Sequence, residues 1–378
     1  MIEPSKLELG GERFTAVYHL AGAEAEARAL ADDLCVEQTV EFPPDLLPDG
    51  PIKDHVVGRV EDFGPRDGGG YRALVSFAIE TVGSELTQLL NVLFGNTSLK
   101  HGVRVERLDL PPGLLARFRG PRLGRRGLRQ LLGAPERPLL CTALKPMGLS
   151  PAELATMAAR FVEGGVDLIK DDHGLADQPF CPFEERVARC AEAVAEANVR
   201  FDKRALYMPN ISAPAHQVLA RARFARDAEA GGLLVAPGLV GWDTMRLLAE
   251  RDDIGLPIMS HPALLGSLVI HPDQGFSCAA LLGQVMRLAG ADAVIYPHHG
   301  GRFPLTEQDC SDLADATAAS MGTLRRAFPT PAGGIHLPRL PDLRRFYGDD
   351  VVFLIGGDLH RDADLIRSCQ RFRELVGQ

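Results

Sequence analysis

Lysine is scarce in this chain of 378 residues. Six lysines stand beside 35 arginines among the 41 basic residues. Two of the six, Lys145 and Lys170, end short apolar runs that are typical of β-strands. Only lysine can lose its proton, act as a base or nucleophile, or take up carbon dioxide as a carbamate. The pattern indicates that these two positions need an amine, although codon drift toward arginine with a few leftover lysines gives the same count.

Other features are missing, and each absence excludes a class of protein. The longest apolar runs, such as residues 232–241, are far shorter than the roughly 20 residues that span a bilayer. Residues 1–6 have neither a basic start nor an apolar stretch, so no signal peptide is expected. There is no GxGxxG after a strand, no Gly-Lys-Ser/Thr loop and no Gly-x-Ser-x-Gly elbow, which disfavours dehydrogenases, kinases and serine hydrolases.

Length and composition indicate a soluble globular protein with two domains. Hydrophobic residues make up 46% of the chain. The seven cysteines are scattered and lack CxxC spacing, which favours a reducing cytoplasm and buried thiols over disulfides or zinc. The net charge of −9 argues against nucleic acid and membrane partners. It does not exclude a phosphorylated substrate, because glycine turns and helix N-termini bind phosphate locally.

Residues 1–130 are expected to form a separate N-terminal domain. They combine strand-like runs at 14–19 and 71–79 with helical patterns at 23–33 and 84–94. The segment 117–127 is basic and rich in glycine and proline, which predicts a linker with a solvated surface.

From Pro138 onward, a strand followed by a helix recurs. The predicted strands end at Lys145, Asp172, Asn210, Pro237, His261, Tyr296, His336 and Asp358. The predicted helices cover residues 150–162, 183–199, 216–230, 242–251, 278–288, 307–326 and 364–376. These repeats predict a TIM barrel over residues 131–378, with a doubly wound open sheet as the alternative. In such barrels, the carboxyl ends of the strands face the active site.

Lys170, Asp172 and His173 close the second predicted strand. Because side chains alternate along a strand, Lys170 and Asp172 project to one side. With His173 they could supply nitrogen and oxygen ligands to a divalent metal, the lysine only as a carbamate. A buried lysine–aspartate ion pair beside a helix-capping carboxylate is the alternative interpretation.

Two glycine pairs, Gly333-Gly334 and Gly356-Gly357, lie at the ends of the seventh and eighth predicted strands. Glycine lets backbone N–H groups approach a phosphate, and TIM barrels commonly bind phosphate after these two strands. The pairs therefore predict a phosphate site, although either one alone is also typical of a tight turn.

Histidines and an arginine complete the predicted rim of the barrel. His261 ends the fifth strand, and residues 296–302 follow the sixth. A single histidine in such a place is more often hydrogen-bonded structure than catalyst, but several on one rim favour a functional role. The residues expected to set substrate specificity are Asn210, Tyr296, His298, His299 and Arg302.

Five segments together resemble the RuBisCO superfamily, of the large-subunit type, over essentially the whole chain. Residues 142–150 resemble the first-strand motif that contains the family's enolising lysine, here Lys145. Residues 164–172 resemble the motif of the carbamylated, metal-binding lysine, here Lys170. The other matching segments are 94–98 in the N-terminal domain and the two phosphate turns, 332–336 and 355–357.

The resemblance implies a fold, a metal and an assembly. The fold is expected to be an N-terminal α+β ferredoxin-like domain, 1–130, followed by a (β/α)8 barrel, 131–378. Mg²⁺ is expected on the carbamylated Lys170 and Asp172. A homodimer or a multiple of dimers is expected, without a small subunit. Each site would then borrow Glu37 and Asn96 from the partner, and His261 is expected to be catalytic.

The departures from a carboxylase are as informative as the matches. Met147 stands where a carboxylase has a second lysine, and His173 replaces the glutamate of the metal motif. Pro262 replaces an arginine, and residues 300–306 lack the lysine that polarises carbon dioxide. The chain therefore resembles the form IV, RuBisCO-like proteins, and is not expected to fix carbon dioxide. His173 is expected to weaken Mg²⁺ binding, to favour softer metals, or to act as an acid or base.

The leading functional prediction is an enolase or isomerase that acts on a phosphorylated keto-sugar derivative through a metal-stabilised enediolate. Methylthioribulose and diketo-methylthiopentyl phosphates are the expected kinds of substrate, with Lys145 shuttling the proton. One alternative is decarboxylation or carbon–carbon hydrolysis of a phosphorylated β-keto sugar acid, of the 3-oxo-isoapionate phosphate type. A second alternative is a non-catalytic relative that serves binding or redox signalling.

Overall fold

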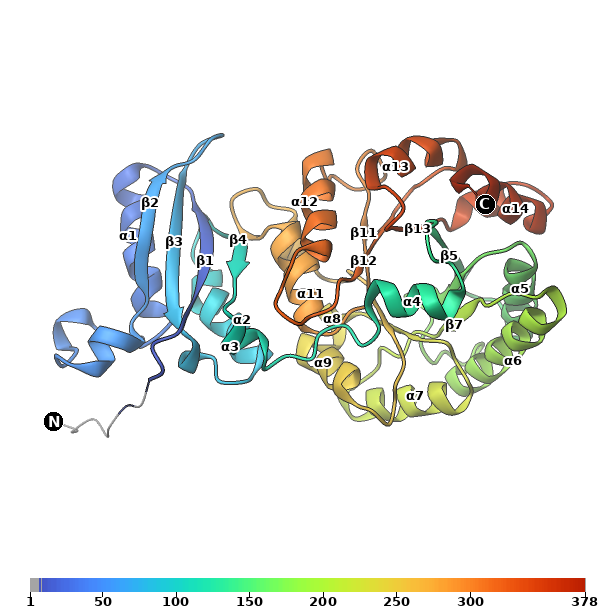
Figure 1. Ribbon diagram of the computed structural model, residues 1–378, viewed down its shortest axis with the longest axis horizontal. Helices are drawn as coiled ribbons and strands as arrows, with labels where there is room; N and C mark the ends of the chain where they lie inside the picture. Colours follow the sequence, from blue (N-terminus) through green and yellow to red (C-terminus); the bar gives the residue numbers. More distant parts are fainter. Residues whose placement is uncertain (1–6, 8, 378) are drawn as a thin grey trace. The chain divides into compact units, whose positions relative to one another are not determined.

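The chain forms two compact units in the computed structural model, which describes residue 7 and residues 9–377 (Figure 1). The described residues up to Phe118 belong to the first unit, together with 265–284 and 320–324. Residues 119–264, 285–319 and 325–377 belong to the second. The units thus divide after residue 118 and not at the predicted 130. Residues 1–6, from which no signal peptide was predicted, lie outside the described part of the chain.

The first unit is built on a five-stranded sheet in the order β10-β4-β1-β3-β2. Its strands are β1 (Arg13–Leu20), β2 (Arg59–Pro65), β3 (Tyr71–Ala78), β4 (Val103–Asp109) and β10 (Gly275–Phe276). Its helices are α1 (Glu24–Glu37), α2 (Leu86–Phe94), α3 (Pro112–Leu115) and α10 (Gly266–Val269). Strand β1 pairs antiparallel with β3 and β4, and the β-α-β-β-α-β order gives the predicted ferredoxin-like fold.

Strand β10 is an element that the sequence did not predict. It pairs parallel to β4 and comes from the segment after the fifth barrel strand. Side-chain amides hold this segment. Gln274 accepts a hydrogen bond from the Gly102 N–H at 3.0 Å, and Gln284 contacts both backbone groups of Leu108. Two residues are too few to show a strand periodicity, so these amides, and not a hydrophobic pattern, define the pairing.

The second unit is a parallel barrel. Its strands are β5 (Leu139–Leu144), β6 (Leu168–Asp171), β7 (Leu206–Met208), β8 (Leu233–Val235), β9 (Ile258–Ser260), β11 (Ala293–Pro297), β12 (Phe328–Ala332) and β13 (Val352–Leu354). They form two four-stranded parallel sheets, β13-β5-β6-β7 and β12-β11-β9-β8. A parallel bridge between Asn210 and Leu234 joins β7 to β8, and β12 packs beside β13. The predicted (β/α)8 barrel is confirmed.

Most helices of the second unit follow a strand as predicted, but the helices at 124–132, 237–240 and 340–347 were not predicted. The helices of this unit are α4 (Gly124–Leu132), α5 (Pro151–Glu163), α6 (Phe183–Phe201), α7 (Ala215–Asp227), α8 (Pro237–Val240), α9 (Trp242–Glu250), α11 (Met286–Leu288), α12 (Glu307–Ala318), α13 (Leu340–Tyr347) and α14 (Leu365–Val376). Ser150 caps α5 in a reciprocal pair, since its backbone N–H donates to Glu153 at 2.8 Å and its hydroxyl accepts from the Glu153 N–H.

Three predicted boundaries were wrong. Strands β12 and β13 end four residues before His336 and Asp358, because backbone turns begin after Ala332 and Leu354. Helix α12 ends at Ala318 and not at residue 326. The buried Arg287 side chain donates to the Ala316 and Ala319 carbonyls at 3.0 and 2.8 Å. It thus satisfies carbonyls that a longer helix would have used.

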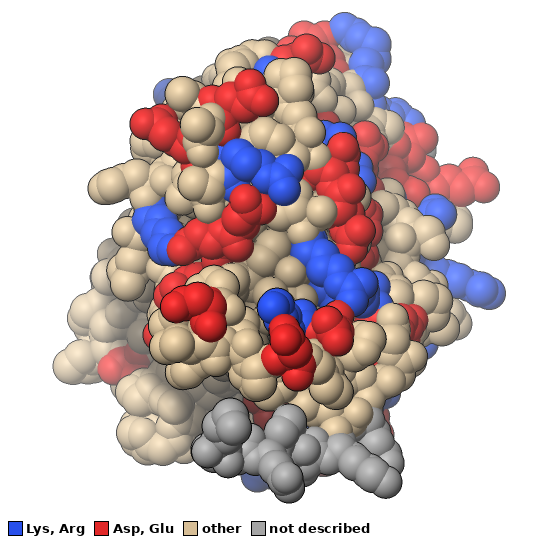
Figure 2. All heavy atoms as spheres, turned by 90° about the vertical axis from the view of Figure 1, so that its left-hand side faces the viewer, with Lys and Arg blue, Asp and Glu red and all other residues tan. Residues whose placement is uncertain are grey.

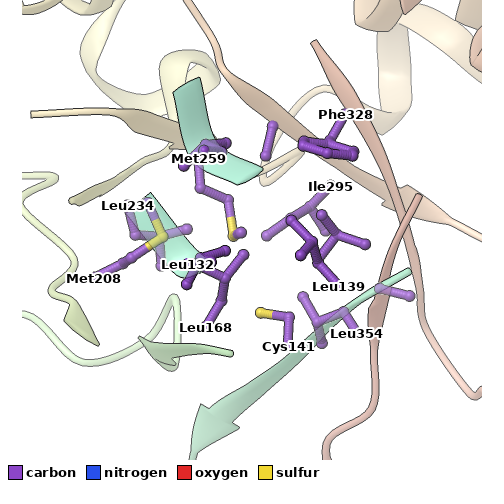
Figure 3. Close-up of a cluster of buried hydrophobic side chains, with 14 of the residues drawn as sticks. Leu132, Leu139, Cys141, Leu168, Met208, Leu234, Met259, Ile295, Phe328 and Leu354 are labelled. Atoms are coloured by element: carbon purple, nitrogen blue, oxygen red, sulfur yellow. The ribbon is translucent and has the colours of Figure 1, made fainter. Parts of the chain in front are cut away.

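Apolar side chains fill the barrel (Figure 3). The residues labelled there include Leu139, Leu168, Met208, Leu234, Met259, Ile295, Phe328 and Leu354. Because Leu168 points inward and side chains alternate along β6, Lys170 also points inward, near the carboxyl end of the strand.

The predicted linker, residues 117–127, crosses the boundary between the two units after Phe118, and its last four residues begin helix α4. Leu128 and Leu132 of this helix belong to the barrel cluster. Within the predicted segment, Arg125 lies over the Phe328 ring at 5.7 Å and pairs with Asp350 at 3.3 Å, whereas Arg126 is exposed. The predicted solvated surface is therefore wrong for Arg125.

The surface carries both signs of charge. Figure 2 shows acidic and basic side chains interspersed on the face seen from the left of Figure 1. Within the described residues, no helix is long and apolar enough to cross a membrane.

Candidate active site

Lys170 is the most enclosed group of the site. The residue is 3% exposed, and its amine donates to the Asp171 carbonyl at 3.0 Å. Burial lowers the pKa of the Lys170 amine below its ordinary value. A neutral amine is the form that can add carbon dioxide, so this environment fits the predicted carbamate.

Asp172 joins the second strand to the first. Lys145 forms an ion pair with the Asp172 carboxylate, whose other oxygen accepts from the Gly174 N–H at 3.0 Å. Burial alone raises the pKa of the Asp172 carboxyl, but the bonds from Lys145 and Gly174 and the charges of both lysines hold it below its ordinary value. Lys145 has a side chain 41% exposed, so the two strand-end lysines differ in burial.

His173 and His261 lie together, as the rim prediction required. Their rings stack with centroids 4.3 Å apart and an interplanar angle of 10°. The Nδ1 atom of His173 is 3.5 Å from the Asp172 carboxylate. Burial and then the Lys170 charge lower the pKa of His261 to about 2, and burial lowers the pKa of His173. Both rings are therefore neutral at physiological pH.

The turn after β13 lies beside Lys145. A Cβ atom placed on Gly356 would lie 3.7 Å from the Lys145 side chain, and one on Gly357 would have nothing within 4 Å. Gly333 and Gly334 have φ angles of 84° and 117°, which favour glycine. The Gly356-Gly357 turn thus offers its backbone next to the Lys145 side chain.

Residues after β11 cover the other glycine turn. The Arg302 N–H donates to the Gly333 carbonyl at 3.0 Å. A Cβ on Gly333 would lie 3.0 Å from the Phe303 ring, and one on Gly334 would lie 3.4 Å from the Arg302 side chain. The structure therefore brings Arg302 to the predicted phosphate turn. Asp358 links the two turns, because it accepts from the Leu337 N–H and lies 2.9 Å from the His336 ring.

The other residues expected to set specificity have mixed positions. The Asn210 amide donates to the His173 and Leu175 carbonyls, both at 2.9 Å, so it braces the backbone of the second loop. The Tyr296 ring packs toward Tyr347, with centroids 6.5 Å apart. His298 is 1% exposed, and neither of its ring nitrogens bonds to a described residue.

Met147 shows what replaces the second lysine of a carboxylase. A Cβ atom on Gly174 would lie 2.6 Å from the Met147 methyl group. The thioether side chain therefore packs against the loop that follows Asp172. An uncharged contact stands where a cation was expected in a carboxylase.

Glu37 and Asn96 lie together in the first unit. The Asn96 amide, in the turn after α2, donates to the Glu37 carboxylate at the end of α1, at 3.0 Å. Residues 59 positions apart thus form one polar pair. Their predicted role in a partner's site stays a prediction.

The predicted donor set for a metal is Lys170, Asp172 and His173. Among the described residues, no three histidine, cysteine, aspartate or glutamate side chains form a group that could hold a metal. Two such side chains and a buried amine are present, so a carbamate on Lys170 would be the third ligand. The residues fit a divalent ion on that condition.

Sequence reasoning missed Asp171 and Arg186, which are both fully buried and ion-paired at 3.1 Å. Asp171 lies inside the metal motif. Only strand alternation, which directs its side chain to the outer side of the strand, distinguishes it from Lys170 and Asp172. Arg186 appeared to be one of many surface arginines, since arginine is rarely buried. Its place three residues into a helix after a polar loop was the only available signal.

The family comparison agrees with this geometry. The sequence profile of the ribulose bisphosphate carboxylase large chain, catalytic domain, matches residues 125–364. The crystal structure of a RuBisCO-like protein from Rhodopseudomonas palustris, 41% identical, aligns with a TM-score of 0.88 over 97% of this chain and 99% of that chain.

Two related enzymes carry names that state a reaction. The 5-methylthioribulose-1-phosphate isomerase of Rhodospirillum rubrum is 40% identical over 349 residues, which cover 92% of this chain and 91% of that protein. The 2,3-diketo-5-methylthiopentyl-1-phosphate enolase of Geobacillus thermodenitrificans is 35% identical over 309 residues, 81% of this chain and 75% of that protein. The predicted resemblance is confirmed: the chain belongs to the RuBisCO large-chain family, among its RuBisCO-like members.

Proposed function

We propose that this protein is an isomerase or enolase of a phosphorylated keto-sugar derivative. The observation that carries the proposal is the position of the Lys145 side chain. Lys145 reaches the Asp172 carboxylate on one side and lies beside the Gly356 turn on the other. A substrate whose phosphate rests on that turn would therefore present its adjoining carbons to the Lys145 amine.

The proposed reaction begins with the transfer of one carbon-bound proton. The Lys145 amine removes it from the hydroxyl-bearing carbon next to the keto group, and the bond electrons form a carbon–carbon double bond while the carbonyl oxygen gains negative charge. Return of the proton to the former carbonyl carbon, with transfer of the neighbouring hydroxyl proton to the former carbonyl oxygen, yields the isomeric ketone, whereas protonation of that oxygen alone yields the enol. No atom is lost or gained, so no co-reactant is needed.

Lys170 as its carbamate, Asp172 and His173 would hold a divalent ion, with Mg²⁺ proposed first. Such an ion polarises a ketone and its neighbouring hydroxyl, which makes the adjacent C–H more acidic. In this proposal the stacked His261 ring keeps His173 in place. Gly333, Gly334, Gly356, Gly357 and Arg302 would bind the phosphate.

We propose a homodimer, in which Glu37 and Asn96 of one copy complete the site of the other. Their mutual hydrogen bond would present them as one polar pair. The isomerase is the first candidate reaction, because its relative matches a larger part of both chains than the enolase does.

The test follows the proton directly. The purified protein, with Mg²⁺ and bicarbonate in D₂O, is mixed with 5-methylthioribulose 1-phosphate or with the diketo-methylthiopentyl phosphate. NMR should show a deuteron entering the carbon next to the carbonyl and a new isomer or enol. Lys145→Met should abolish both, whereas Lys203→Met, at an exposed position, should change neither.

Exchange and turnover by Lys145→Met at the wild-type rate would refute the proton-shuttle role. Release of carbon dioxide from a β-keto sugar acid phosphate, without exchange on either ketone, would favour the decarboxylase instead. Binding without turnover of any of these compounds would favour the non-catalytic alternative.

A further inference from the structure

Asp171 lies between two site residues in sequence but faces away from them. It is fully buried, and strand alternation directs it to the side opposite Lys170 and Asp172. Its carboxylate accepts three hydrogen bonds, from the Tyr207 hydroxyl at 2.8 Å, from Arg186 Nε at 3.1 Å and from the Asn210 N–H at 3.0 Å. Asp171 thus ties strand β6 to helix α6 and to the end of strand β7.

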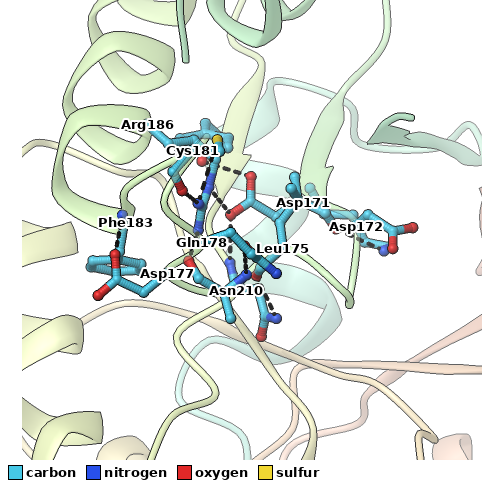
Figure 4. A network of polar contacts seen from close by, with 12 residues as sticks. Asp171, Asp172, Leu175, Asp177, Gln178, Cys181, Phe183, Arg186 and Asn210 are labelled. Carbon is cyan, nitrogen blue, oxygen red and sulfur yellow. Dashed lines mark hydrogen bonds and ion pairs between the residues drawn. The ribbon is translucent and has the colours of Figure 1, made fainter. Parts of the chain in front are cut away.

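Arg186 extends this contact into the loop between β6 and α6 (Figure 4). Its guanidinium donates to the Ala176 carbonyl at 2.8 Å and to the Cys181 carbonyl at 3.1 Å. The side chain is 0% exposed, so every one of these contacts is made away from water. The planar guanidinium provides several donors in fixed directions, which a lysine could not reproduce.

Asn210 links the same carboxylate to the residue after Asp172. Its backbone N–H donates to Asp171, and its side-chain amide donates to the carbonyls of His173 and Leu175. The position of His173 therefore depends on the carboxylate of Asp171 through a single intervening residue.

Gln178 closes the loop on itself. Its amide donates to the Gly174 carbonyl at 2.7 Å, and its oxygen accepts from the Ala176 N–H at 2.9 Å. Gly174 in turn donates its N–H to Asp172. The backbone from His173 to Cys181 is thus held by the side chains of Asn210, Gln178 and Arg186.

We propose that Asp171 and Arg186 are positioning residues that fix the loop 172–181, and with it Asp172 and His173, in the geometry that the reaction requires. Only the kinetic test of this inference rests on the proposed function. Neither residue can reach the barrel interior, because both belong to the layer between the strands and α6. Their effect must pass through the loop.

The test compares two buried carboxylates. Asp292 is also buried and also accepts three hydrogen bonds, from the N–H groups of Leu123, Gly124 and Ile258. It stands just before β11, at the opposite end of the barrel strands. Asp171→Asn and Asp292→Asn should both lower the melting temperature, so a loss of stability alone cannot separate them.

Hydrogen–deuterium exchange is the first readout. At a temperature where both variants are fully folded, Asp171→Asn should raise exchange in residues 172–181 by tenfold or more. Asp292→Asn should leave that segment at the wild-type rate. Equal protection of this segment in both variants would overturn the inference, whether or not the protein turns over the proposed substrates.

The kinetic readout is the second. Groups that orient metal-binding residues typically change activity or affinity by about 10–100-fold when they are replaced. Asp171→Asn and Arg186→Lys should lower kcat by this factor while KM changes less than about threefold, since the phosphate turns are untouched. A wild type without turnover would refute the proposed function and leave the exchange result to decide this inference. Unchanged kcat in Asp171→Asn, with an active wild type, would contradict the positioning role.

Discussion

At the scale of single residues, the two lysines selected by their rarity have different surroundings. Lys170 is enclosed, whereas Lys145 is half exposed and ion-paired. The sequence could place both at strand ends, because strand periodicity and the helix that follows are local. It could not show exposure at the rim, because exposure depends on loops from other parts of the chain.

Lys170→Arg tests whether the site needs the lysine amine or only a positive charge. Arginine keeps the positive charge but cannot form a carbamate at neutral pH. We expect loss of Mg²⁺ and bicarbonate dependence and a fall in activity of at least about 100-fold, the upper end for metal-site changes. Mass spectrometry after rapid trapping of carbamates checks the modification. Lys203→Arg is the matched control, and retained bicarbonate dependence in Lys170→Arg would contradict the assignment.

His298 gives a pH prediction. Burial, with His299 and Arg339 nearby, lowers the pKa of His298 to about 4, whereas an unfolded histidine titrates near about 6.5. Below a pH of about 6.5, the unfolded state binds a proton at this histidine and the folded state does not. The free energy of unfolding therefore falls as the pH is lowered from about 6.5 to about 4. His298→Gln should therefore reduce the loss of unfolding free energy between pH 7.5 and 5 by about 2 kcal/mol.

Chemical denaturation at both pH values measures this difference. His55→Gln, at an exposed position of the first unit, is the control for the substitution itself. A slope for His298→Gln equal to that of the wild type would show that His298 does not titrate as described.

At the scale of elements, the sequence predicted best what hydrophobic periodicity and capping encode. Helix α5 lies within one residue of the predicted range 150–162 at each end, and the eight barrel strands appear in order. The boundaries that failed depend on distant partners. Helix α4 was not predicted, because its arginines bind Asp350 and a phenylalanine ring and so do not lie on a solvated surface. The end of α12 was predicted too late, because Arg287 donates hydrogen bonds to the carbonyls there.

Arg287→Met should destabilise the end of α12. The variant removes the part-buried hydrogen bonds to the Ala316, Ala319 and Arg325 carbonyls, and a polar group that loses its partner in a buried site costs about 1–3 kcal/mol. We expect a loss of about 3 kcal/mol in the unfolding free energy. Arg326→Met, at an exposed neighbouring position, should stay within about 0.5 kcal/mol of the wild type. Similar stability of the two variants would contradict the capping role of Arg287.

At the scale of the whole molecule, the sequence predicted both folds but not which residues belong to each. The segment 265–284 follows barrel strand β9, yet it completes the sheet of the first unit. A motif reveals a residue's neighbours in the chain, whereas membership of a unit depends on contacts between residues far apart in sequence. The Asn96–Glu37 bond shows the same limit.

The proposed dimer has a sharp test. Glu37→Gln and Lys145→Met should each abolish turnover, because each removes one half of every site. In a mixed dimer, one site carries both changes and the other carries neither. Co-expression of the two variants should therefore restore about a quarter of the wild-type activity, if subunits pair at random in a two-fold dimer. No restoration, with mixed dimers verified by mass, would show that Glu37 acts within its own chain or not at all.

The membership of β10 has a consequence for how this protein can be divided. A gene fragment that stops at Phe118 would encode the first unit without its outermost strand, so β4 would become an open edge that invites aggregation. A barrel expressed from residue 119 onward would carry a twenty-residue segment without its sheet. The two units are therefore not interchangeable cassettes, and recombination between relatives should succeed only when a crossover leaves β4 and β10 from the same parent.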